Sequence, residues 1–550
     1  MRKIFIAVLI MITCESSQAF TPEQPIMKLN QVRPGMTGRA LTVLRGITPE
    51  KIPVKIISII PKTPNHNEIL IKFLGGYKLA KGMSGSPVYI RGRIAGAVRS
   101  GWEDSDQTLA AVTPIEEMCA ILDDNLNHDK NFLAGDLILS GMSKNFLLEK
   151  FADSLGLNLT QGISRASHNI NIDNSRLKPG DSVSVLLAWG DVDLSASGTI
   201  TATSKTGEFI AFGHSFLKRG GANYPAAKTF IHETVNSSSF PFKLTTPLSI
   251  NGTITHDKES GIAGRFNYFG HSIGCELVFN NLDTGESSNY KFRVIADEFL
   301  TPSLLNGLFT GLTEEAWGRK GQGTMLINLR IDSKNVNNGW TRQDIFFSGE
   351  NVLAKAFEQP VKIIDAFMTQ PFINIMPAGF RITVNATQYP RALIIEDVDA
   401  PKSARPGDDV AILVTLREWR KDTFRRKFIL RIPESASGVC EVVVRGGNTQ
   451  PMSQLAVESG YKSINSLARM LDELKAIDSN NELFIELNTD KLGESLRSAL
   501  SGKNNSDFLP EEQEYLSETK SRRIKEGTLK ILSSEYFIDG MMKRIIHIDK

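Results

Sequence analysis

The chain has 550 residues, of which 41% are hydrophobic and 23% charged, as in a globular protein of several domains. Its 63 Lys and Arg residues nearly balance its 61 Asp and Glu residues, so the net charge of +2 gives no electrostatic reason to expect nucleic-acid binding. Of the four cysteines, Cys14 lies in an N-terminal segment that we expect to be removed, and the remaining three, Cys119, Cys275 and Cys440, leave room for one disulfide. No closely spaced Cys/His set predicts zinc. No cofactor or metal is predicted.

The N-terminus has the pattern of a secretion signal. A cationic start, Met1-Arg2-Lys3, precedes an apolar run from Ile4 to Thr13, and Ser17-Gln18-Ala19 places small residues at a cleavage site. We therefore expect a signal peptide over residues 1–19, cleavage after Ala19 and a periplasmic or secreted location. The alternative is an uncleaved anchor, which needs about 20 apolar residues to span a bilayer comfortably. No later run is that long and apolar, so we expect no stable membrane span after signal removal.

Residues 20–124 are predicted to form a small β lobe. Strand-like runs at 40–44, 54–60 and 69–73 precede an apolar hairpin over 88–98, and a barrel or closed sheet would accommodate them. A helix is expected to begin after Thr113, with Thr113 as its N-cap, Pro114 at its first position and Glu116 completing a capping box.

The turn Gly82-Met83-Ser84-Gly85-Ser86-Pro87 connects the third run to the hairpin. Glycines beside a serine allow backbone amides to converge near its hydroxyl, as an oxyanion hole requires. Ser84 is the candidate nucleophile, and the N–H groups of Gly82 and Ser84 are the candidate oxyanion donors. The Ser86 hydroxyl is expected to bond locally to the turn backbone. An ordinary Gly/Ser turn is the alternative.

The rest of the chain divides by its pattern. We predict a connector over 125–181 with a helix at 144–155, a second β lobe over 182–300, a helix plus a β-sandwich-like domain over 301–448, and a mixed α/β region over 449–550. The predicted fold class is mainly β, with a two-lobed β-barrel region followed by these two domains.

His214 follows an apolar strand pattern inside the second lobe and is the candidate general base. An imidazole can take a serine proton and deliver it to a leaving amine, because its pKa lies near working pH. A structural histidine is the alternative, and His271, in the similar string Phe269-Gly270-His271-Ser272, is a competing base.

The serine segment GMSGSPVYIRGRIAGAV, followed by Ala110-Ala111-Val112-Thr113-Pro114-Ile115, resembles that of the SpoIVB-type serine peptidase family, and Gly207 to His214 resembles the family's histidine motif. The resemblance covers roughly residues 34–118 and 190–265. It implies a chymotrypsin-related peptidase in which Ser84 is the nucleophile and His214 the base of an acyl-enzyme mechanism.

The chain departs from the family in three ways. The serine segment precedes the histidine segment here, which permutes the family's order. No counterpart of the family's PDZ domain is found, and residues 71–77 lack its upstream aspartate. Possible substitutes for this orienting acid are Asp191, Asp193, Glu233 and Asp257.

These observations predict an exported serine endopeptidase that acts on a protein or peptide substrate. The alternative is a catalytically inactive peptidase-fold protein that serves as a binding or scaffold protein of the cell envelope, and a third reading is a precursor that cleaves itself once. Cleavage preference and oligomeric state do not follow from the sequence.

Overall fold

The computed structural model describes residues 20–63, 66–102, 105–122, 136–163, 170–237, 240–449, 464, 466–489 and 516–549. The protein is mainly β and divides into two compact units, Met1–Lys144 with Glu149–His271, and Asn145–Leu148 with Ser272–Lys550. The expected signal peptide lies outside the described residues. Within the described part, none of the helices has the length and apolar content of a membrane-crossing segment.

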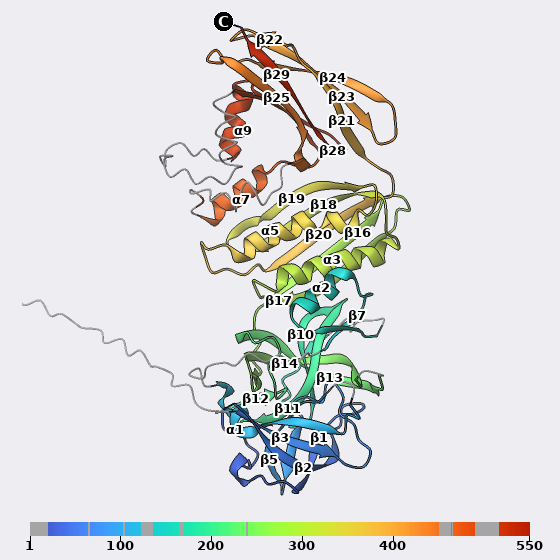
Figure 1. Ribbon diagram of the computed structural model, residues 1–550, viewed down its shortest axis with the longest axis vertical. Helices are drawn as coiled ribbons and strands as arrows, with labels where there is room; N and C mark the ends of the chain where they lie inside the picture. Colours follow the sequence, from blue (N-terminus) through green and yellow to red (C-terminus); the bar gives the residue numbers. More distant parts are fainter. Residues whose placement is uncertain are drawn as a thin grey trace, which may run out of the picture. The chain divides into compact units, whose positions relative to one another are not determined.

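The N-terminal part of the first unit is a closed antiparallel barrel, as the alternating pattern predicts (Figure 1, blue). Its strands pair in the order β1-β2-β3-β6-β5-β4, and β1 pairs with β4 to close it. In β2 the side chains of Ile52, Val54 and Ile56 are buried while their neighbours are exposed, so every second residue enters the core. The strands are β1 Thr37–Thr42, β2 Glu50–Thr63, β3 His66–Phe73, β4 Pro87–Ile90, β5 Arg93–Ser100 and β6 Leu109–Pro114.

A second circuit of six strands follows in the same unit. Antiparallel pairings run from β10 through β13, β14, β15, β12 and β11, and β11 pairs back with β10. The short strand β7 pairs with β11, β8 pairs with β7, and β9 pairs with β14. The elements are β7 Asp136–Ser140, α2 Phe146–Ser154, β8 Asn158–Gln161, β9 Asn171–Ile172, β10 Ser182–Gly190, β11 Asp193–Thr203, β12 Glu208–Ala211, β13 Gly220–Val235, β14 Phe242–Lys258 and β15 Gly261–Phe266.

The predicted N-cap at Thr113 is wrong. Helix α1 spans Ile115–Cys119, its N-cap position is Pro114, and no side chain caps it. Thr113 instead belongs to β6, where it pairs with Ala97, and its hydroxyl donates to the carbonyl of Gly213 at 2.5 Å. The Thr113 hydroxyl, which the local sequence predicts to cap the helix, therefore bonds to a buried carbonyl near the second circuit instead.

The second unit begins with five neighbouring strands in the order β19-β18-β20-β16-β17. Helices α3 and α5 are adjacent to each other, and α3 packs on β16 and β17 (Figure 1). The elements are β16 Ser272–Asn281, β17 Ser287–Ile295, α3 Thr301–Trp317, β18 Gly323–Ser333, β19 Val336–Ser348, α4 Leu353–Ala356, α5 Glu358–Thr369 and β20 Gly379–Thr387.

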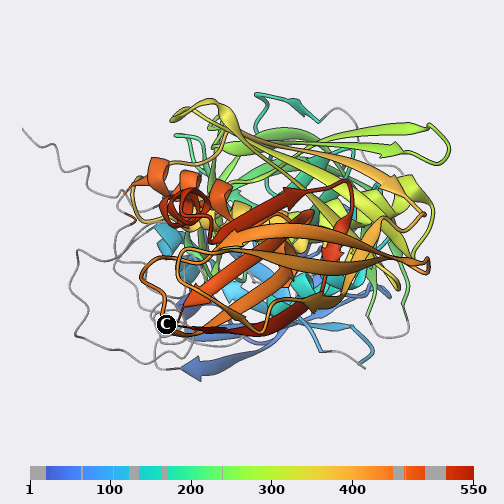
Figure 2. The same cartoon turned by 90° about the horizontal axis from the view of Figure 1, so that it is seen from above.

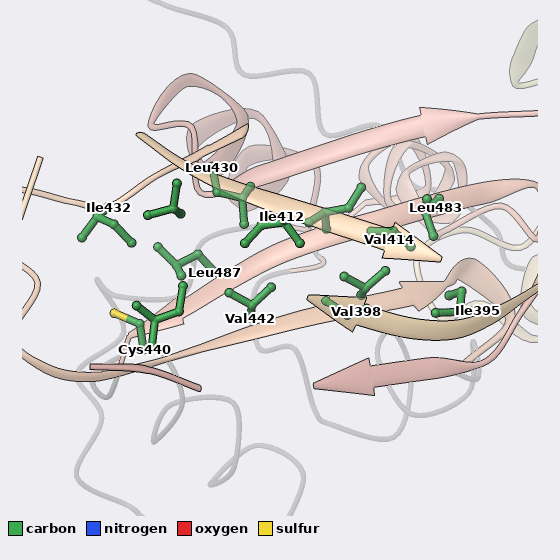
Figure 3. Close-up of a cluster of buried hydrophobic side chains, with 14 of the residues drawn as sticks. Ile395, Val398, Ile412, Val414, Leu430, Ile432, Cys440, Val442, Leu483 and Leu487 are labelled. Carbon is green, nitrogen blue, oxygen red and sulfur yellow. The ribbon is translucent and has the colours of Figure 1, made fainter. Parts of the chain in front are cut away.

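Two further sheets share one apolar core in the C-terminal part of this unit, where the orange and red strands can be followed in Figure 2. The first has the order β24-β23-β21-β28, and the second has the order β22-β29-β25-β26-β27. Side chains such as Val398 and Ile412 from the first sheet meet Val442 and Leu487 from the second (Figure 3). The elements are β21 Ala392–Asp399, β22 Ser403–Ala404, β23 Asp409–Glu418, β24 Thr423–Arg431, β25 Gly438–Gly446, α7 Leu467–Ala476, β26 Glu482–Thr489, α9 Leu516–Lys525, β27 Leu529–Ser533, β28 Phe537–Asp539 and β29 Met541–Ile548.

Candidate active site

The serine turn, residues 82–87, lies between β3 and β4 of the barrel. Gly82 and Gly85 have φ values of 91° and 88°, a left-handed conformation that favours glycine. The amides of Met83, Gly85 and Ser86 all donate to backbone carbonyls. The N–H groups of Gly82 and Ser84 donate to none of the described residues. The turn therefore presents two unused donors on either side of Met83, at the two residues predicted to form the oxyanion hole.

Ser84 and Ser86 have different environments. The Ser86 side chain is fully buried and its hydroxyl donates to the Met83 carbonyl at 2.5 Å, which confirms the predicted local bond. Ser84 is partly exposed, and its hydroxyl makes no hydrogen bond to a described residue. Of the two serines, only Ser84 has a hydroxyl available for a reaction.

The turn fits against β11 of the second circuit so closely that a side chain at Gly85 is excluded. A Cβ on Gly85 would lie 2.1 Å from the Thr199 carbonyl oxygen and 2.4 Å from the Phe212 nitrogen. The Ser84 carbonyl accepts a hydrogen bond from Thr199 N–H at 2.8 Å, and the Gly85 carbonyl accepts one from the Thr201 hydroxyl at 2.7 Å. Contacts to the main chain of the turn thus fix it to the second circuit.

Further close contacts hold the histidine segment, residues 212–214, against the barrel. A Cβ on Gly213 would lie 2.8 Å from the Val98 carbonyl oxygen of β5, and the Gly213 carbonyl accepts the Thr113 hydroxyl. Phe212 is buried at a φ of 69°, an unusual conformation for a bulky residue. Strain of this kind collects at functional sites, where the surrounding structure holds it in place. Here it precedes His214 by two residues.

The His214 ring has a defined tautomer. Its Nδ1 lies 2.7 Å from the Ser215 carbonyl oxygen, which can only accept, so Nδ1 carries the proton and Nε2 the lone pair. The pKa of His214 is lowered to about 4, chiefly by burial and also by the Arg99 charge, while the bond to Ser215 and the Glu259 charge oppose this. His214 is therefore neutral at pH 7, with Nε2 ready to accept a proton.

Ser84 and His214 line one cavity of about 340 Å³ in the first unit. No hydrogen bond joins the two side chains. The competing histidine, His271, does not line this cavity. Two motifs that are far apart in the sequence thus lie around the same space. The apolar lining includes Leu79, Ile138, Phe212, Phe216, Phe240 and Phe242, and the charged lining consists of Lys81, Arg99, Asp136 and Lys243.

None of the four candidate orienting acids lines the cavity. Asp257 is buried and its carboxylate accepts from the N–H groups of Phe216 at 2.7 Å and Leu217 at 2.6 Å, so it holds the loop after His214 and not the imidazole. Burial raises the pKa of Asp257, and these backbone bonds oppose the rise. Asp193 accepts from Gly190 N–H.

The remaining two candidates are no better placed. Glu233 has a side chain that is 58% exposed beside Arg45, and Asp191 lies outside the cavity lining. The group that orients His214 in this structure is instead the backbone carbonyl of Ser215.

The structure adds a residue that the sequence analysis missed, Lys243. Its side chain is 1% exposed, and its Nζ donates to the Thr42 hydroxyl at 2.8 Å and to the Gly82 carbonyl at 3.0 Å. Burial lowers the pKa of Lys243 from 10.5 to about 7. Lys243, Thr245 and Pro247 are the buried positions of this part of β14, whereas the apolar Phe242 and Leu244 alternate with them, so the sequence pattern carried no signal for a buried lysine.

Comparison with known proteins finds no matching family model, no matching curated protein and no matching solved structure. The resemblance of the two motif segments to SpoIVB-type peptidases stays a prediction.

Proposed function

We propose that this protein is a serine endopeptidase that cleaves a protein or peptide substrate through an acyl-enzyme. The observation that carries the proposal is the single cavity lined by Ser84, with its unbonded hydroxyl, and by His214, with its neutral imidazole. The two unused N–H groups of Gly82 and Ser84 complete the set of groups that acyl transfer needs.

The proposed reaction assigns a role to each group. Nε2 of His214 takes the proton of Ser84 as the hydroxyl oxygen attacks the substrate carbonyl, and the Gly82 and Ser84 amides receive the negative oxygen. The imidazolium then gives its proton to the leaving amine. Water hydrolyses the ester by the same steps. Hydrogen bonds between nucleophile and base are often long in free enzymes and tighten with substrate, so the missing Ser84–His214 bond is compatible with this scheme.

A backbone carbonyl in place of an orienting carboxylate has a cost for the reaction. The Ser215 carbonyl fixes the tautomer of His214, as the aspartate of a triad does, but it carries no negative charge to stabilise the imidazolium. Glu259, which is ion-paired with Arg99, is the negative group that acts on the imidazole. We therefore expect slow turnover compared with that of triad enzymes.

The finer description of the fold belongs to the same proposal. We interpret the closed barrel and the second six-strand circuit as the two lobes of a chymotrypsin-related region, with Ser84 from the first and His214 from the second. The two C-terminal sheets that share a core are interpreted as a β-sandwich. The four phenylalanines that line the cavity favour a substrate with an apolar side chain beside the cleaved bond. Export through the N-terminal signal is part of the proposal.

A fluorophosphonate probe, which reacts with activated serines, tests the assignment. The wild type is expected to be labelled at Ser84, and the Ser84→Ala and His214→Ala variants are expected to lose labelling. His271→Ala is the matched control, because this histidine lies outside the cavity lining. Labelling that survives in both Ser84→Ala and His214→Ala would refute the proposed site.

A second candidate function is a binding protein that retains the fold without its activity. It is favoured by one observation, the absence of a hydrogen bond between Ser84 and His214 in a cavity that both line. In that case the wild type remains unlabelled under all conditions, while an apolar peptide still protects the partly exposed, cavity-lining Lys81 from chemical modification.

A further inference from the structure

Lys243 is placed to control the serine turn. It lies at the start of β14, and its backbone N–H donates to the Lys81 carbonyl at 3.1 Å, immediately before the turn. Its Cβ, Cγ and Cδ atoms lie 3.1–3.4 Å from the position that a Cβ on Gly82 would occupy. The lysine stem therefore covers Gly82, and any side chain at that position would displace it.

The charged end of Lys243 has neutral partners only. Its Nζ donates to the Thr42 hydroxyl and to the Gly82 carbonyl, and no carboxylate of the described residues forms an ion pair with it. The charged groups around it are Lys81 and Asp136, which pair with each other at 2.9 Å, and Arg99 on the same cavity. An unpaired ammonium without solvent is costly, whereas an apolar residue of the same length would pack there without that cost.

The Gly82 carbonyl that Lys243 holds belongs to a peptide plane of particular importance. This plane joins Gly82 to Met83, so it lies between the two N–H groups assigned to the oxyanion hole. Rotation of the plane changes ψ of Gly82 and φ of Met83, and with them the relative direction of the two donors. The Thr199 hydroxyl is a second, longer donor to the same carbonyl at 3.3 Å.

We propose that Lys243 is a positioning residue of this site, which holds the Gly82–Met83 peptide plane through its bond to the Gly82 carbonyl and so keeps the oxyanion donors aligned. The inference rests on the proposed peptidase function. It makes the site pH-sensitive on the alkaline side, because the ammonium is a stronger donor than the neutral amine that replaces it above pH 7.

The rate of fluorophosphonate labelling at Ser84 tests this role. Lys243→Met removes the donor and is expected to slow labelling about 100-fold, the effect of losing one oxyanion-hole donor. Lys243→Gln restores an N–H donor and is expected to recover part of the rate. Lys228→Met is the matched control, a half-buried lysine of β13 outside the cavity lining. With a peptide substrate, kcat is expected to fall while KM changes little.

The pH profile of the wild type needs no variant and separates this role from that of a general base. Positioning predicts that labelling slows as pH rises through about 7, whereas a Lys243 base predicts faster labelling and no rescue by glutamine. A rise through pH 7, or wild-type labelling in Lys243→Met, would overturn the proposal. Loss of labelling in step with loss of folding would also overturn it. A wild type that is not labelled refutes the peptidase function instead.

Discussion

Arg445 in the second unit and Lys243 in the first are both buried cations, but their surroundings differ. Arg445 lies 2.7 Å from Asp478 and 2.6 Å from Glu486, and Glu486 also pairs with Arg523 at 2.8 Å. The hydrogen-bond partners of the Lys243 ammonium are the Thr42 hydroxyl and the Gly82 backbone carbonyl. A buried charge that serves only the fold is compensated by opposite charge, so an uncompensated one suggests a different use.

Removing one acidic side chain from the ion-pair cluster around Arg445 tests the case in which a buried charge is compensated. Glu486→Leu leaves the guanidinium groups of Arg445 and Arg523 buried with fewer negative partners. We expect the free energy of unfolding to fall by about 3–5 kcal/mol, the usual cost of breaking a buried pair. Denaturant unfolding measures it, and an unchanged midpoint would mean that the cluster is not structural.

For Lys243, which has no carboxylate partner among the described residues, we expect a change of the opposite sign in the free energy of unfolding. Lys243→Met removes an uncompensated charge, so we expect the variant to be as stable as the wild type or more stable at pH 6. The folded pKa of about 7 lies below the unfolded value, so between pH 7 and 10.5 the unfolded state binds the additional proton and wild-type stability rises with pH. The slope is about 1.4 kcal/mol per pH unit for one proton.

The check is the difference between wild type and Lys243→Met in denaturant titrations from pH 6 to pH 9, which cancels groups common to both. The stability advantage of the variant should shrink as pH rises above 7. A difference independent of pH would contradict the lowered pKa.

His214 extends the comparison to a second group of the cavity that lacks a carboxylate. Because burial lowers its pKa to about 4, the base form persists through pH 5. Labelling of Ser84 should therefore change little between pH 7 and pH 5 and fall about tenfold per unit below pH 4. Rates measured in buffers of equal ionic strength test this, and a fall centred near 6.5 would indicate an ordinary histidine.

The smallest effect is expected at the surface, where solvent compensates charge. Lys362 and Glu358 form an exposed i,i+4 pair on α5 at 2.8 Å. Lys362→Met should change the free energy of unfolding by at most about 0.5 kcal/mol. A loss as large as that of Glu486→Leu would show that exposure does not separate these cases.

Much of the site could be predicted because its parts are local in sequence. The serine turn is specified by consecutive residues, and the barrel by the alternation seen at Ile52, Val54 and Ile56. Ser84 and His214, selected from separate motifs, line one cavity, and their catalytic roles remain predictions. Local bonds such as that of Ser86 follow from neighbouring residues.

What could not be predicted depends on distant partners. A lysine in an alternating strand indicates a solvent-facing position, and only the surrounding strands show that Lys243 points inward. Thr113 has every local mark of an N-cap, yet its hydroxyl bonds to Gly213, one hundred residues away. An orienting acid is a side chain that a sequence can show, whereas the group at His214 is a backbone carbonyl, whose position depends on the fold.

The contact of Gly85 with Thr199 and Phe212 has a consequence for how this site can vary. The two six-strand circuits meet there through carbonyls, amides, the absence of a Cβ and a few threonine hydroxyls, so their fit depends on a small number of positions. Substitutions at other surface positions of either circuit should then leave Ser84 and His214 around the same cavity. We expect proteins that share this site to keep glycine at the positions of Gly85 and Gly213 even where the rest of their sequences differ.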